Sequence, residues 1–222
     1  MDVYILHLET ATKVCSVAIS KNGQLIALKE SDDSEYLHGE VITLFIEDVL
    51  KQAQLSIQQL SAVAITSGPG SYTGLRIGVS TAKGLCFALS IPLISVDALY
   101  SLAYLAHQQH PHSTICAMID ARRMEVFSAI YDAQLNVLKP ISADILDEAT
   151  YQQFEPFIAI GDGAPKMQEL WKNRNIQFET AILCSAKGQI TKAYEKFNHQ
   201  EFEDVAYFEP FYLKDFVSTA KK

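Results

Sequence analysis

The alternation of apolar and polar positions predicts that the chain opens with β-structure. Val3–Leu8 and Val14–Ser20 are rich in β-branched and other apolar residues, and a short polar turn separates them. Asn22-Gly23 comes next, and this dipeptide readily takes two positive φ angles, so we expect a hairpin into a third strand at Gln24–Lys29. The first segment is therefore expected to be a three-stranded meander.

Beyond this meander, strand and helix patterns alternate, which is typical of an α/β fold. Apolar residues at helical spacing predict helices over Leu37–Ala53 and Thr73–Leu89, and Asp97 is placed to cap a third helix that runs to about His107. The polar stretch 108–113 suggests a boundary between an N-terminal lobe, 1–107, and a C-terminal lobe, 108–222. The remaining expected elements are strands at Ser61–Thr66, Leu93–Val96, Ile115–Ile119, Glu125–Tyr131 and Phe157–Ile160, and helices near Asp147–Phe154, Pro165–Asn173 and Lys187–Phe197.

One pattern occurs twice, in residues 6–19 and in residues 117–130. Each copy has an apolar strand, an acid (Glu9 or Asp120), a short polar turn and a second strand ending in Ala-Ile. Two unrelated hairpins would look the same, but each copy opens one half of the chain. Two related lobes that face each other across a cleft are the architecture of actin-like ATPases and sugar kinases, whose first hairpins present an acid and backbone N–H groups to nucleotide phosphates.

A glycine-rich segment, Gly68–Gly78 (GPGSYTGLRIG), joins a predicted strand to a predicted helix. It lacks the lysine and hydroxyl residue of a Walker loop, and its serine does not have the spacing of a nucleophile elbow. From Gly74 onward, every fourth residue of the predicted helix is small. Glycine within a helix costs about 1 kcal/mol of stability relative to alanine. Close approach of another backbone would compensate, either within this chain's own core or from a partner helix. This small-residue stripe consists of Gly74, Gly78, Ala82 and Cys86.

The first predicted helix carries two apolar stripes. One, which includes Ile42, Phe45, Ile46 and Val49, has the spacing of a core-facing surface. The other, Leu37, Val41 and Leu44, is rotated toward a neighbouring face. A surface helix needs only one apolar face, so the second stripe indicates either a partner helix or complete burial within this domain.

Composition limits the function classes. The 222 residues include 18 Lys and Arg against 26 Asp and Glu, a net charge of −8, which disfavours a chain that binds nucleic acid on its own. Four widely spaced cysteines, the lack of a signal-peptide pattern and the lack of an apolar run long enough to span a bilayer favour a cytoplasmic protein with buried thiols. No helix has a histidine pair four residues apart, and His107, His110 and His112 fall in a polar loop, so we expect no metal site.

Two polar loops in the second half are candidates for phosphate or nucleotide contacts. Asp120-Ala121-Arg122-Arg123 combines an acid with two cations, although a charged turn with exposed arginines has the same sequence. Gly161-Asp162-Gly163 follows a strand, in the position of an adenine-side loop of the two-lobed ATPases, although such a triplet alone indicates only a turn.

Taken together, these segments resemble the bacterial TsaB (YeaZ) family of tRNA threonylcarbamoyladenosine biosynthesis proteins, which is related to the TsaD family. The resemblance implies an actin-like (ASKHA, RNase H-like) two-lobed fold with mixed sheets flanked by helices. It also implies a metal-binding partner, TsaD, which transfers the threonylcarbamoyl group to adenosine 37 of tRNA, and a small ATPase subunit, TsaE. In this family TsaB is a scaffold that activates TsaD and can self-associate through the same face. The matching segments are Glu9–Thr12, Cys15–Ala18, Gly68–Gly78, Asp120–Val126, Gly161–Gly163 and Glu209–Lys214.

The resemblance assigns roles to particular residues. It places the partner interface on the first two helices, where we expect Leu37, Val41, Leu44, Phe45, Gly74, Arg76, Ile77, Gly78, Thr81, Ala82, Leu85 and Cys86. It also identifies vestigial nucleotide or phosphate loops at Glu9, Thr10, Thr12, Asp120, Arg122, Gly161, Asp162 and Gly163. The family more often has Asp in place of Glu9, Phe in place of Tyr72 and Arg in place of Lys214, and Glu9 weakens the case for a working metal–nucleotide site.

The leading functional hypothesis is therefore a non-catalytic partner subunit with no catalytic residues of its own. We expect no tightly bound cofactor, at most weak or interface-dependent ATP or ADP, only indirect contact with tRNA and no contact with a membrane. The alternative is a stand-alone actin-like small-molecule kinase or ATPase, which the two acidic hairpins would favour. A peptidase is a third reading, but the chain offers neither a histidine metal pair nor an evident Ser–His–Asp set.

Overall fold

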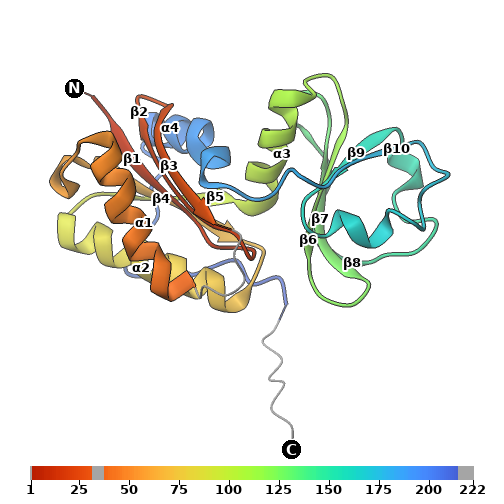
Figure 1. The fold of residues 1–222 in the computed structure, drawn as a ribbon, viewed down its shortest axis with the longest axis horizontal. Helices are drawn as coiled ribbons and strands as arrows, with labels where there is room; N and C mark the ends of the chain where they lie inside the picture. Colours follow the sequence, from red (N-terminus) through yellow and green to blue (C-terminus); the bar gives the residue numbers. More distant parts are fainter. Residues whose placement is uncertain (1, 32–37, 215–222) are drawn as a thin grey trace, which may run out of the picture.

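Two five-stranded mixed sheets form the frame of the protein in a computed structural model that describes residues 2–31 and 38–214. Figure 1 shows one sheet in each of two lobes, with α3 between them. In chain order the strands and α-helices are β1 (Tyr4–Glu9), β2 (Cys15–Lys21), β3 (Gln24–Ser31), α1 (His38–Ala53), β4 (Ala62–Gly68), α2 (Tyr72–Leu89), β5 (Leu93–Asp97), α3 (Ala98–Gln109), β6 (Ile115–Asp120), β7 (Glu125–Tyr131), β8 (Val137–Ile145), β9 (Phe157–Ile160), β10 (Ile176–Glu179) and α4 (Ile190–His199).

The opening meander and the helices that follow it are confirmed. Asn22 and Gly23 take φ angles of 51° and 76°, as the two-residue hairpin requires, and β1 pairs antiparallel with β2. The side chain of Ser71 caps α2 by accepting from Gly74 N, and that of Asp97 caps α3 by accepting from Tyr100 N. Apolar residues of α1 and α2 bury one face of the first sheet, where both helices lie (Figure 1).

The repeat predicted from the sequence is also confirmed, because the two sheets have one topology. The strand orders are β3-β2-β1-β4-β5 and β8-β7-β6-β9-β10, and in each sheet the first hairpin is antiparallel while the later neighbours are parallel. Glu9 and Asp120 therefore occupy equivalent positions at the ends of β1 and β6.

The domain boundary needs correction, because each lobe takes a helix from the other half of the sequence. α3, which falls almost wholly in the predicted lobe 1–107, packs mainly on β6 of the second sheet. α4, which falls in the predicted lobe 108–222, packs on the first sheet, where Ala193 contacts the cluster around Ile5 and Ile94. The segment after α4 stays there, since Glu203 bridges to Leu93 and Phe211 N donates to Ser67 O at 2.7 Å.

Two predicted helices of the second lobe are wrong. Only a 3₁₀ turn, Gln152–Phe154, forms within the stretch predicted as helix after Asp147, because the Asp147 carboxylate accepts from Ala149 N and Thr150 N and fixes a turn. Near Pro165 a 3₁₀ turn, Ala164–Met167, again replaces an α-helix. Trp171 follows it and is fully buried, with its indole N–H donating to Asp147 O at 2.8 Å.

Some of the remaining predicted elements are present, and two strands of the second sheet are not predicted. β8 and β10 were not anticipated, whereas the strand Phe157–Ile160 and the helix near Lys187–Phe197 are present, the latter as a 3₁₀ turn followed by α4. All four cysteines are buried and unpaired, as expected. No helix among the described residues is long and apolar enough to cross a bilayer.

Candidate functional site

Glu9, the acid at the end of β1, is fully buried. Its Oε1 accepts a hydrogen bond from Ala11 N at 2.7 Å, and its Oε2 accepts one from Thr66 Oγ1 at 2.5 Å. Gln189 Nε2 donates in turn to Thr66 Oγ1 at 2.7 Å. Burial raises the pKa of Glu9 to about 7, and the nearby carboxyl of Asp97 acts in the same direction. Both carboxylate oxygens are thus engaged by this chain's own donors.

The glycine-rich loop closes over the turn that follows Glu9. Ser71 N donates to Ala11 O at 2.6 Å. A Cβ atom at Gly70 would lie 2.3 Å from Ala11 O, and one at Gly74 would lie 2.1 Å from Thr10 O. Thr10 and Thr12, two of the predicted phosphate-loop residues, are buried beneath this contact. The glycines therefore serve close backbone packing, and the first hairpin turn presents no open cradle within the described residues.

The predicted interface stripe on α2 is wrong, because it faces this chain's own sheet. Gly74, Gly78, Ala82 and Cys86 are all buried, and a Cβ atom at Gly78 would lie 2.3 Å from Thr10 Oγ1. The internal alternative, close approach within this chain's own core, holds instead.

The predicted contacts on α1 change as well. Val41 and Phe45 belong to the core cluster between α1 and the first sheet, so they are not available to a partner. Leu37 lies outside the described residues. Of the two described residues of the second apolar stripe, Val41 is buried and Leu44 is exposed.

The opposite faces of the same two helices are exposed and partly apolar. Leu44 on α1 is 56% exposed and Phe87 on α2 is 81% exposed. A Cβ atom at Gly84 would have no neighbour within 4 Å, so this glycine is not required by internal packing. We call this surface the helix face. It comprises the exposed residues Leu44, Arg76, Gly84 and Phe87 and the half-buried residues Ile77, Thr81 and Leu85, of which Ile77 and Leu85 also pack against the core. Gly84 and Phe87 do not follow from the sequence pattern because they lie off the small-residue stripe.

Arg76 sits at one end of the helix face with partners from this chain. Its guanidinium carbon lies 4.2 Å from the centroid of the Tyr72 ring, and its Nε donates to Tyr212 Oη at 3.3 Å. The rings of Tyr72 and Tyr212 are 4.6 Å apart. The C-terminal segment that contains Tyr212 is thereby fixed to the start of α2, beside the helix face.

The second hairpin turn brings together the remaining predicted loop residues. Asp120 N donates to Asp162 Oδ1 at 2.9 Å, and Asp120 Oδ1 lies 2.6 Å from Lys166 Nζ. Arg122 N donates to Asp120 Oδ1 at 2.5 Å, with Arg122 at a φ of 70°. Burial raises the pKa of Asp162, and the hydrogen bond from Asp120 N and the charges of Lys13 and Lys166 oppose that rise.

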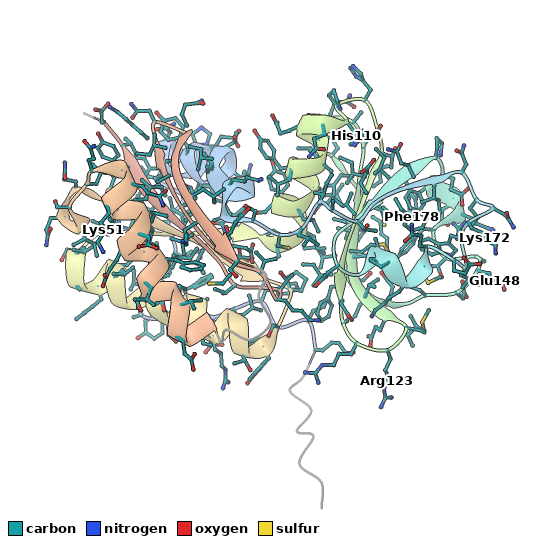
Figure 2. All side chains as sticks on the ribbon, viewed as in Figure 1. Lys51, His110, Arg123, Glu148, Lys172 and Phe178 are labelled. Atoms are coloured by element: carbon teal, nitrogen blue, oxygen red, sulfur yellow. The ribbon has the colours of Figure 1, made fainter. Side chains whose placement is uncertain are left out.

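Glycines also fix the backbone of this second turn. Gly161 has a φ of 89°, and a Cβ atom there would lie 2.2 Å from Met118 O. Gly163 N donates to Met118 O at 3.1 Å. Figure 2 shows the neighbouring Arg123 extending away from the lobe at this end of the second sheet. The described residues contain no group of three or more His, Cys, Asp or Glu side chains able to hold a metal ion.

Comparisons with known proteins show which proteins this chain is similar to. The family described as "TsaD: tRNA N6-adenosine threonylcarbamoyltransferase" matches residues 32–220. The chain is 31% identical to the Escherichia coli tRNA threonylcarbamoyladenosine biosynthesis protein TsaB, over 98% of this chain and 97% of that protein. The solved structure of YeaZ from Pseudomonas aeruginosa is similar with a TM-score of 0.80 at 26% identity, covering 95% of this chain and all of that one.

A more distant structure supports the fold alone. Component A of the Acidaminococcus fermentans (R)-2-hydroxyglutaryl-CoA dehydratase has a TM-score of 0.54 at 11% identity, over 87% of this chain and 98% of that one. The actin-like, two-lobed α/β fold expected from the sequence is confirmed.

Proposed function

Because this chain belongs to the TsaB family of tRNA threonylcarbamoyladenosine biosynthesis proteins, we propose that it is a non-catalytic subunit of the tRNA threonylcarbamoyladenosine machinery. In this proposal it binds a TsaD-type transferase through the helix face and activates it together with a TsaE-type ATPase. The single observation that carries the proposal is the similarity to TsaB along nearly the whole of both chains.

The exposed apolar residues support the helix face as the contact surface. Phe87 and Leu44 lie on adjacent helices and leave large apolar side chains in water, which is a common mark of a protein interface. Gly84 adds a position at which a partner helix can approach the backbone closely. The family match to TsaD indicates that the two partners share one fold, so equivalent helices of both chains would meet.

The closed first turn supports a non-catalytic role. An actin-like phosphate site needs free backbone N–H groups and an available acid beside the first hairpin, whereas here Glu9 and the N–H of Ala11 bind each other. In this proposal, binding of ATP or ADP to this chain is weak or depends on formation of the complex. It also leaves tRNA to the other subunits, in line with the net charge of −8.

The binding step is tested by calorimetry with the TsaD-type protein of the same organism and a Gly84→Arg variant of this chain. The arginine would project from the helix face without an internal clash, so we expect normal folding and at least tenfold weaker binding to TsaD. Unchanged affinity of the folded variant would contradict the assignment of the interface. Dilution of this chain alone in the calorimeter measures its self-association. When the partner is absent we expect the wild-type chain to self-associate through the helix face, and the Gly84→Arg variant to do so more weakly.

A further inference from the structure

A cavity of about 620 Å³ opens between the two lobes and is independent of the helix face. Its wall comes from the end of β5, the first turn of α3, α4 and the strands β7 and β8. This volume is in the range of small-molecule sites, which are mostly apolar with a few polar groups that fix orientation. Its lining includes Asp97, Tyr100, Tyr131, Ile141, Lys192 and Lys196.

Asp97 supplies a negative charge at this cavity. Its Oδ1 accepts from Tyr100 N at 2.8 Å, and no cationic side chain among the described residues lies within 4.0 Å of its carboxylate. Burial raises its pKa to about 6, and the backbone N–H groups of Tyr100 and Leu99, together with the charge of Lys196, only partly offset this effect. A desolvated carboxylate beside an open cavity would gain free energy from a cation bound next to it.

Two aromatic rings stand beside this carboxylate. Tyr100 and Tyr131 lie edge to face with centroids 6.2 Å apart, and Tyr131 is almost completely buried. Aromatic faces attract ammonium groups and also bury apolar ligand surface. Ile141 of β8 adds an aliphatic wall.

Two lysines of α4, Lys192 and Lys196, line the same cavity. Lys192 Nζ lies 5.8 Å from the centroid of the Tyr100 ring, and its other partner is the exposed Glu195 at 3.2 Å. Lys196 Nζ donates to Ser95 O at 2.9 Å. A ligand with only a positive charge would be repelled by these two ammonium groups, and one with only a negative charge would be repelled by Asp97.

We propose that this cavity binds a small zwitterion of the amino-acid class, with its ammonium group at Asp97, its carboxylate at Lys192 and Lys196, and an apolar side chain against the tyrosines. Charges of both signs, Asp97 against Lys192 and Lys196, line one mostly apolar cavity, and this feature selects the class over amines, carboxylates and neutral apolar compounds.

Calorimetry on the full chain with a matched set of probes tests this proposal. L-phenylalanine and L-leucine are compared with phenethylamine, which lacks the carboxylate, and with 3-phenylpropionate, which lacks the amine. We expect saturable binding of at least one amino acid at millimolar concentration, and at least tenfold weaker binding of both single-charge compounds. Absence of binding by both amino acids, or a single-charge compound that binds as tightly as phenylalanine, would overturn the proposal.

Two variants locate the site. Asp97→Asn keeps the cap of α3, because asparagine is an equally good capping residue, and removes the charge. Lys192→Met removes the second charge from a partly exposed position. Each is expected to weaken amino-acid binding at least tenfold with the thermal midpoint nearly unchanged. Lys172→Met, at the far end of the second lobe (Figure 2), is the control that should bind normally. Wild-type affinity in both cavity variants would show that the site lies elsewhere.

Discussion

At the residue scale, Glu9 shows how a position typical of catalysis can become structural. The sequence places an acid at the end of the first strand, but it does not reveal that Thr66 and Ala11 would occupy both carboxylate oxygens. Those contacts depend on the loop after β4, which is brought over the turn by the tertiary fold. The type of residue could therefore be predicted from the sequence, and its accessibility could not.

The raised pKa of Glu9 predicts a pH-dependent stability. A carboxyl whose pKa rises from 4.5 to about 7 on folding holds its proton more tightly in the folded state, so its contribution is fully present below pH 4.5 and is lost as the pH rises through 7. Glutamine does not titrate, so the Glu9→Gln variant should not lose stability in this pH range. Urea unfolding should show it no more stable than wild type at pH 5 and about 2 kcal/mol more stable at pH 8. A difference that is the same at both pH values would show that Glu9 is not protonated on folding.

Two glycines of α2 predict opposite effects of the same substitution. At Gly84 the new methyl group meets nothing, so Gly84→Ala should raise the free energy of unfolding by about 0.5–1 kcal/mol through helix propensity. At Gly74 it would lie 2.1 Å from Thr10 O, and the backbone shift this forces should lower the free energy of unfolding by about 1–3 kcal/mol. Urea denaturation of the two variants measures both, and equal effects would contradict the packing described here.

At the element scale, the sequence predicts local structure well where one or two residues determine it. Asn22-Gly23 specifies its hairpin and Asp97 specifies the start of α3. The helix predicted after Asp147 is absent, because side-chain hydrogen bonds to the backbone and burial of Trp171 decide the local structure there. The helical stripe on α2 was recognised, but its direction toward the sheet depends on the contact with Thr10, which spacing alone does not contain.

The helix face makes a prediction about α1 and α2. Leu44→Asp and Phe87→Asp introduce charge at positions that are already exposed, so the free energy of unfolding should change by less than about 0.5 kcal/mol. Each charge would be desolvated in the complex, so binding to TsaD should weaken at least tenfold. Ile145→Asp is the matched control, because Ile145 on β8 is 78% exposed but lies in the other lobe. Equal loss of affinity for TsaD in all three variants would contradict the assignment of the interface to the helix face.

At the scale of the whole molecule, the repeat in the sequence predicts two sheets of one topology, and it does not predict how helices are shared between them. α4 and the segment after it return to the first sheet, because the face around Ile5 and Ile94 would otherwise be exposed to water. Such a return depends on contacts between distant parts of the chain. The polar stretch 108–113 marks only where the second sheet begins.

This exchange of helices predicts that the lobes do not fold separately. A chain that ends at residue 185 would lose Ala193 and the bridge from Glu203 to Leu93, and it would expose the second face of the first sheet. We expect it to lose the cooperative thermal transition of the full chain, as followed by near-UV circular dichroism. A truncated chain that unfolds cooperatively near the midpoint of the full chain would show that the first lobe is complete without α4.

In the proposed function, this chain activates a TsaD-type transferase through the helix face. The most direct test of this activation is the initial rate of tRNA threonylcarbamoylation by purified TsaD and TsaE, measured without this chain, with the wild-type chain and with Phe87→Asp. We expect a rate that depends on the wild-type chain and falls at least tenfold with the variant at equal concentration. A rate that is the same without the chain, or fully restored by the variant under conditions where binding is not saturated, would contradict the proposed function.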